Sequence, residues 1–204
     1  MDRIEKVRDE IRGHWFKDHV ATITEHEGVT ILDWRKPGTF MYAVKYVMVG
    51  NKLFISGDIG DAVYDLTWEA TIDSFDTVNL SYFTGKLSCS SREKYDFNEK
   101  LAQAQINEYF IDWCDVDNVR DLEEGDKDLY DELISATTEW STPEHFSSMG
   151  VWTAYNNTSC DWFDGETASC IEDCGKELSS EFIAYLLGIQ MANEQIKLHK
   201  EELV

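Results

Sequence analysis

The alternation of apolar and polar positions is most regular within residues 40–68. An almost unbroken apolar run at 41–49 is followed by a short polar turn at 50–52, and the chain returns through 53–55. Two β-rich runs joined by so short a turn predict a β-hairpin. Alternation resumes at 62–66 after two glycines, so we expect the returning strand to bulge or to be re-aimed before it continues.

Other β-rich runs flank this hairpin. Residues 20–24 and 29–34 surround a Glu-Gly turn and predict two short strands. A fifth strand is expected at 78–83, followed by a short edge segment at 85–87. The first half of the chain is therefore expected to be dominated by a sheet.

Apolar residues recur at helical spacing in five further stretches. Ser90 and Glu93 form a capping-box pattern before the second stretch, and Thr142-Pro143 marks the start of the fourth. The predicted helices lie at 2–13, 93–113, 126–140, 143–150 and 178–200. Residues 151–176 lack periodicity, so we expect a loop-rich segment with one hairpin.

Strands early in the chain and helices later predict an α+β fold. We expect a mainly antiparallel sheet of about five strands covered by helices, with a C-terminal helical region. At 204 residues the chain is expected to form one domain, 1–204. Its N-terminal helix and sheet would occupy 1–91, and a mostly helical, acidic part would occupy 92–204.

Charge is distributed very unevenly. The net charge is −22; residues 51–175 carry −20 of it, whereas residues 1–50 are neutral. Such a field repels nucleic acid and anionic membranes and attracts basic surfaces, so we expect no direct nucleic-acid binding. No apolar run reaches the roughly 18–20 residues that span a bilayer. Because the charged start MDRIEKVRDEIRG is unlike a signal peptide, we expect a soluble, intracellular protein.

Carboxylates are densest between residues 117 and 139, a segment that contains nine acidic and two basic side chains. The ordinary explanation is a solvated face that keeps the protein soluble. A more specific hypothesis is that these carboxylates mimic DNA phosphates and occupy the Lys/Arg groove of a nucleic-acid-binding protein. The uneven distribution of charge along the chain favours this hypothesis, because solubility alone does not require it. The predicted partner-binding residues are Asp117, Asp121, Glu123, Glu124, Asp126, Asp128, Asp131 and Glu132, joined by Asp58, Asp61 and Asp65.

Cysteine and histidine supply the competing chemistry. Five scattered cysteines fit reduced thiols better than a disulfide framework. A structural zinc has weak candidate ligands, because thiolates and imidazoles bind zinc but no CxxC pair is present. These candidates are Cys160, Cys170, Cys174 and His145. No histidine lies in a catalytic motif, so we expect no cofactor and no enzymatic activity, with a metal- or histidine-dependent enzyme as the alternative.

The run YAVKYVMVGNKLFISGDIGDAVYDLTW, followed by YFTGKLSCSS, resembles a family of small acidic proteins from phages and prophages of Firmicutes. The resemblance covers about residues 40–92 and lies in the hairpin, the GD-x-GDAVY turn and Tyr82-Phe83-x-x-Lys86. Some acidic proteins from this setting are similar to anti-CRISPR inhibitors of type II Cas nucleases. The resemblance implies an inhibitor that binds such a nuclease in the cytoplasm of a bacterial host, and it transfers no functional residues.

A third function stays open. The chain is also consistent with a regulatory interaction module for some other basic partner. Such a module would form a homodimer through aromatic side chains that we expect to be exposed. These are Trp152, Tyr155, Trp162 and Phe163.

Overall fold

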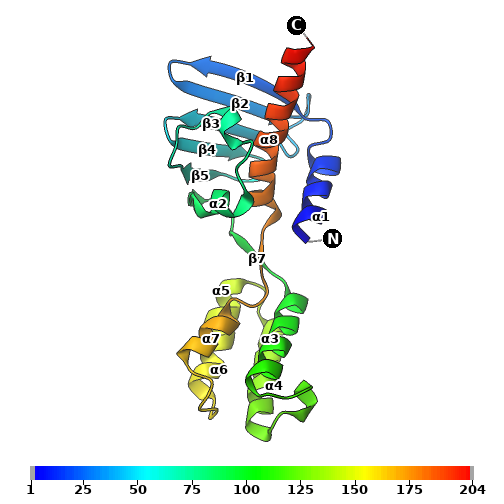
Figure 1. Cartoon of the computed structure of the whole chain (residues 1–204), viewed down its shortest axis with the longest axis vertical. Coiled ribbons are helices and arrows are strands. Elements are labelled where there is room, and N and C mark those ends of the chain that lie inside the picture. Colours follow the sequence, from blue (N-terminus) through cyan, green and yellow to red (C-terminus); the bar gives the residue numbers. More distant parts are fainter. Residues whose placement is uncertain (1–2, 203–204) are drawn as a thin grey trace. The chain divides into compact units, whose positions relative to one another are not determined.

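The computed structural model describes residues 3–202 and confirms the α+β class, with helices and an antiparallel sheet (Figure 1). The chain forms two compact units. Unit 1 consists of Met1–Lys94 and Ser179–Val204, and unit 2 of Tyr95–Leu178. The first boundary lies close to the one expected near residue 91. The last helix, however, belongs to unit 1 and not to the acidic part.

Unit 1 is built on a six-stranded antiparallel meander in which each strand pairs with the next along the chain. The strands are β1 (Val20–His26), β2 (Val29–Arg35), β3 (Val44–Val49), β4 (Lys52–Gly57), β5 (Ala62–Asp65) and β6 (Leu87–Ser90). The predicted central hairpin is β3–β4, and Val49 lies opposite Lys52 at its turn. Glycine at position 50 has a φ of 55°, which suits this tight connection.

Alternation along the strands buries one face of the sheet. Leu32, Tyr46, Leu53 and Tyr64 are fully buried on the inner face, while their strand neighbours on the outer face are more exposed. Because side chains of a strand point alternately to opposite faces, this pattern places the core of unit 1 on one side of the sheet.

The inner face is covered by α8 (Ser180–Glu201), which Figure 1 shows crossing the sheet. An unbroken run from Phe182 to Ile189 is buried, so this helix has packing partners all round. On its other side lie α1 (Arg3–Glu10) and the π-helical turn η1 (Ile11–Trp15). The Tyr46 hydroxyl donates to the backbone oxygen of Tyr185 over 3.0 Å, which ties α8 to the sheet.

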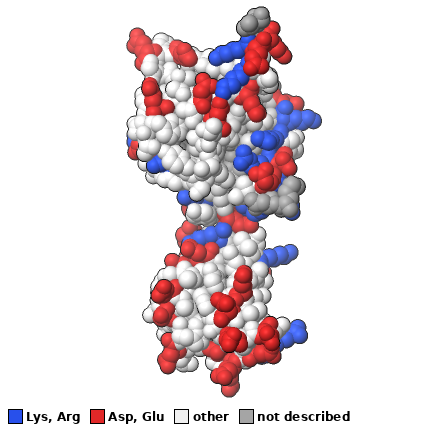
Figure 2. All heavy atoms as spheres, viewed as in Figure 1, with Lys and Arg blue, Asp and Glu red and all other residues white. Residues whose placement is uncertain are grey.

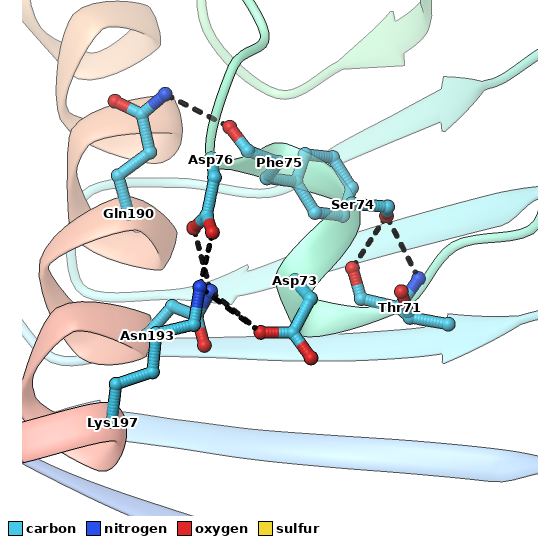
Figure 3. Close-up of polar contacts among 8 residues, drawn as sticks. All are labelled: Thr71, Asp73, Ser74, Phe75, Asp76, Gln190, Asn193 and Lys197. Atoms are coloured by element: carbon cyan, nitrogen blue, oxygen red, sulfur yellow. Dashed lines mark hydrogen bonds and ion pairs between the residues drawn. The ribbon is translucent and has the colours of Figure 1, made fainter.

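A polar clamp fixes α8 to the 3-10 turn η2 (Ile72–Phe75), as Figure 3 shows. Gln190 donates to the backbone oxygens of Phe75, the last residue of the turn, and of Val78. The Asn193 amide, only 2% exposed, donates to Asp73 over 3.1 Å and to Asp76 over 2.6 Å. Lys197 pairs with both carboxylates. These bonds satisfy the buried Asn193 amide, while Asp73, Asp76 and Lys197 lie on the solvent side of the clamp.

The strand expected at 78–83 is wrong, because this segment forms the short helix α2 (Leu80–Gly85). The Asn79 side chain caps it by accepting the backbone N–H of Tyr82 over 2.8 Å. Phe83 stacks on Tyr64 with ring centroids 4.1 Å apart. A cap and one buried ring therefore outweigh the β propensity of the segment.

Unit 2 is mainly helical around its own apolar core. Its elements are β7 (Tyr95–Phe97), α3 (Glu99–Trp113), η3 (Val119–Asp121), α4 (Glu124–Glu139), α5 (Pro143–His145), η4 (Phe146–Val151), α6 (Trp152–Asn157), α7 (Gly165–Glu172) and β8 (Lys176–Leu178). Strands β7 and β8 pair with each other, and α3 packs on α4.

Two predictions about the start of α3 and about residues 151–176 are wrong. Ser90 ends β6 in unit 1 instead of starting a helix, and Asn98 caps α3 by accepting the N–H of Leu101. Residues 151–176 contain α6 and α7 instead of loops. The Asp164 carboxylate caps α7 by accepting two backbone N–H groups, and the helix buries Ala168 and Ile171. Eight residues were too few to show a period in the sequence.

Gly188 allows the close approach of α8 to the sheet. A Cβ atom there would overlap the Tyr46 hydroxyl and lie 3.1 Å from Phe16. We expect Gly188→Ala to lower the free energy of unfolding by about 1–2 kcal/mol. Overpacking of a core costs about 1–3 kcal/mol, and the higher helix propensity of alanine offsets up to about 1 kcal/mol of this loss. Denaturant titration measures this change. The control Gly13→Ala, which meets no atom within 4 Å, should be neutral or stabilising; equal losses for both variants would contradict this account.

Asn193→Ala should lower the free energy of unfolding by about 1–2 kcal/mol, because it removes two hydrogen bonds to charged groups. The Asn193 bond and then Lys197 lower the pKa of Asp73. A carboxyl group whose pKa is lower in the folded state stabilises the fold at pH values above its pKa in the unfolded chain, about 3.9. This contribution disappears as the pH falls through the pKa of the folded state. The difference in melting temperature from the wild type should therefore be larger at neutral pH than below pH of about 3. A difference that is independent of pH would refute the linkage, and exposed Asn157→Ala is the control.

Candidate acidic binding surface

The negative charge of the protein is concentrated in unit 2. Its 84 residues contain 21 acidic side chains and four basic ones, a formal charge of −17, whereas unit 1 carries −5. In Figure 2, which shows one face, carboxylates on both units form separate groups with uncharged surface between them. The visible surface is therefore not uniformly acidic, and its carboxylates are grouped on particular parts of the chain.

Helix α4 forms because one of its sides is apolar and its first turn is acidic. Leu129, Leu133 and Ala136 recur at helical spacing and are buried. Glu124 and Asp126 lie in the first turn, where carboxylates interact favourably with the helix dipole. The packing of the apolar side against unit 2 leaves the opposite side of α4 in solvent.

That opposite side carries what we call the α4 carboxylate stripe, a set of exposed acidic residues. The stripe consists of Glu124, Asp128, Asp131, Glu132 and Glu139. At 3.6 residues per turn these positions fall within an arc of about 100° around the helix axis. The stripe therefore faces one direction along the whole length of α4.

The carboxylates of the stripe form no ion pair within the described residues. No ion pair involves a carboxylate between Glu99 and Glu172 in residues 3–202. Asp128 lies one turn from Glu124, Asp131 and Glu132, and each like-charged pair at this spacing destabilises a helix by about 0.2–0.5 kcal/mol. Lys127, one turn from Glu124 and Asp131, offsets part of this repulsion, so the folding of α4 gains little from the spacing of its acids.

A second acidic feature lies along α3. A hollow of about 600 Å³ is lined by Glu108, Asp112 and Asp115 together with Tyr109, whose ring stacks on Trp113 at 4.7 Å. These carboxylates were absent from the predicted site. Their spacing of four and three residues on a helical segment was the signal in the sequence that could have identified them.

Three predicted residues, Asp117, Asp121 and Glu123, are exposed in the segment that leads into α4. Asp126 points inward instead, where it accepts a 2.7 Å hydrogen bond from the indole nitrogen of Trp162. Asp126 therefore supports the packing of unit 2, and the surface contains seven of the eight acids predicted in this region.

The other three predicted acids lie in unit 1. Asp58 accepts the backbone N–H of Tyr42 over 2.8 Å, and Asp65 pairs with Lys52. Asp61 is exposed in the turn before β5. Two of the three are thus engaged in local contacts of the sheet unit.

The four weak candidates for zinc ligands contact different parts of unit 2. The Cys160 thiol donates to the backbone oxygen of Gly125, and the His145 ring packs against Trp140. Cys170 and Cys174 lie one turn apart at the end of α7. Within residues 3–202 there is no group of three or more His, Cys, Asp or Glu side chains placed for one metal ion.

Two thiols have strongly raised pKa values. Burial and then the Asp126 charge raise the pKa of Cys114 to about 11. Burial raises the pKa of Cys174 to about 12, with a smaller contribution from Asp173. Since the thiolate is the reactive and metal-binding form, both groups are poor nucleophiles at neutral pH.

The aromatic side chains that we expected at a dimer surface are part of the unit 2 core. Phe163 is buried, and Trp152, Tyr155 and Trp162 are half-buried against it. The indole of Trp152 also donates to Glu172 over 2.9 Å. These rings are held by contacts inside the unit.

Comparison with protein-family models, with curated proteins and with solved structures finds no match to this chain. In the described part, residues 3–202, no helix combines the length and the apolarity needed to cross a membrane.

Asp126→Asn should make Cys114 more reactive, because it removes the negative charge that opposes the thiolate while keeping an acceptor for Trp162. We expect alkylation of Cys114 below pH 9 to accelerate by about threefold to tenfold, since a one-unit pKa change alters the thiolate fraction tenfold. Site-resolved mass spectrometry measures this rate, and exposed Cys89 in the same chain is the internal control. An unchanged Cys114 rate would contradict the assigned contact.

Proposed function

We propose that this protein inhibits a nucleic-acid-binding protein by occupying its basic groove with the α4 carboxylate stripe, and that the target is a type II CRISPR nuclease. The observation that carries the proposal is the unpaired, one-sided arrangement of acids on α4. The choice of target is supported by the resemblance of residues 40–92 to small acidic phage proteins.

The charge density of the stripe supports a mimic of nucleic acid. Five carboxylates lie along 15 residue steps of about 1.5 Å, a mean spacing of roughly 5–6 Å, and the four between 124 and 132 are roughly 4 Å apart, compared with about 3.4 Å between charges along a single DNA strand. A basic channel shaped for a phosphate backbone would therefore meet a similar charge spacing on α4.

The acidic hollow on α3 extends the same chemistry. Its three carboxylates and the face of Tyr109 suit a lysine or arginine side chain, which carboxylates and aromatic rings both attract. The hollow would receive one basic side chain of a partner. Complementary charge of this kind accelerates encounter and directs the choice of partner.

Neutralising the stripe tests the proposal. We expect Asp128→Asn, Asp131→Asn and Glu132→Gln together to weaken binding to the guide-loaded nuclease by about 100-fold, at about 1 kcal/mol per charge. Binding of the wild type should also weaken as salt is raised, because screening reduces attraction between opposite charges. Both changes can be followed by calorimetric titration.

The matched control is Glu144→Gln, Asp161→Asn and Glu166→Gln, which changes unit 2 by the same charge at exposed positions outside α4. This control should retain most of the affinity. Equal losses for the two triple variants would show that only total charge matters. Absence of binding by the wild type would reject the nuclease as target and favour another basic partner.

A further inference from the structure

The outer face of the unit 1 sheet carries a continuous apolar row. Residues directly opposite each other on neighbouring antiparallel strands point to the same face. Ile31 lies opposite Val47, Val47 opposite Phe54, and Phe54 opposite Val63. The row therefore crosses four strands, from β2 to β5. Beside it, Val29 lies opposite Val49 and widens the apolar patch.

This face is not covered as the inner face is. Phe54 and Val49 are 42% and 41% exposed, and the other members of the patch are half-buried. The contacts of α8 and α2 with the sheet run through inner-face residues such as Tyr46 and Tyr64. Contiguous apolar surface of this kind marks an interaction site.

The charged side chains around the patch neutralise each other. Lys45 pairs with Asp33 over 3.4 Å, and Lys52 pairs with Asp65 over 2.5 Å. A neutral apolar face on a chain of charge −22 offers no attraction to a basic partner or to a nucleic acid. The surface that complements it is equally flat, apolar and neutral.

We propose that this outer face is the interface of a homodimer, in which two copies pack sheet against sheet. The interface residues are Val29, Ile31, Val47, Val49, Phe54 and Val63. In a two-fold contact the same patch serves both partners, so each copy supplies the neutral apolar surface that the other requires. Sheets packed in this way lie about 10 Å apart and interlock their facing side chains.

The size of the face allows a weak dimer. The interface residues lie on four strands, β2 to β5, which at about 4.8 Å per strand and about six residues in length give a footprint of roughly 19 by 20 Å. The projecting side chains raise the accessible area above this footprint of roughly 400 Å², which is about half of the approximately 800 Å² per partner of a standard interface. Phe40 and Met41, both exposed in the loop before β3, lie at the margin of the sheet and add to it.

Electrostatics gives this dimer a distinctive salt dependence. Two chains of charge −22 repel each other outside the neutral interface, so added salt should strengthen self-association. Binding through the α4 stripe should instead weaken with salt. The two proposals are thus independent, and opposite salt responses separate them.

Sedimentation equilibrium of the full chain, over a concentration series at low and high salt, tests the dimer. We expect Phe54→Glu and Val49→Lys each to weaken dimerisation by at least about tenfold, since a buried unpaired charge costs more than the 1.4 kcal/mol that a tenfold change represents. Met149→Glu, at a residue of unit 2 that is 52% exposed, should leave it within about twofold.

The two interface variants change the net charge in opposite directions, so general repulsion cannot explain a loss in both. Thermal unfolding of each variant verifies that it is folded, which the partial exposure of both positions favours. A wild-type chain that stays monomeric throughout, or a dimer that both variants leave intact, would overturn the proposal.

Discussion

The burial of α8 on nearly all sides is the constraint on which the rest of the structure depends. The helix covers the inner face of the sheet and receives α1, η1 and η2 on its other sides. It reaches the sheet only after the 84 residues of unit 2, and the Ser179 N–H donates to the Lys94 carbonyl where the chain leaves and re-enters unit 1. Because α8 occupies one face of the sheet, the residues of the other face remain more exposed.

Charge has different roles in the two units. In unit 1, carboxylates such as Asp73 and Asp76 bind lysine and asparagine and take part in the fold. In unit 2, the acids of the α4 carboxylate stripe form no ion pair in the described residues and repel one another along the helix. We propose that these residues, which do not contribute to the fold, are retained for binding to a basic surface.

Most of the sheet could be predicted from the sequence, because β3, β4, β5 and the second half of β2 alternate buried with more exposed residues and so have a period of two. The prediction of a strand at 78–83 was wrong because the β propensity of this segment outweighed the helix cap at Asn79 in reading the sequence. Helix α7 is too short to show its period. Most residues of the stripe could be predicted from the density of charge in the sequence. The inward orientation of the Asp126 side chain could not, because it depends on a hydrogen bond from Trp162, 36 residues later in the chain. Contacts between distant segments leave no local pattern.

The central claim is that the carboxylates of the α4 stripe serve binding and not folding. Thermal unfolding of the Asp128→Asn, Asp131→Asn, Glu132→Gln chain at low salt tests this most directly. Relief of like-charge repulsion predicts a melting temperature equal to or a few degrees above that of the wild type. A decrease of several degrees would show that these side chains hold the fold together, and would contradict the account.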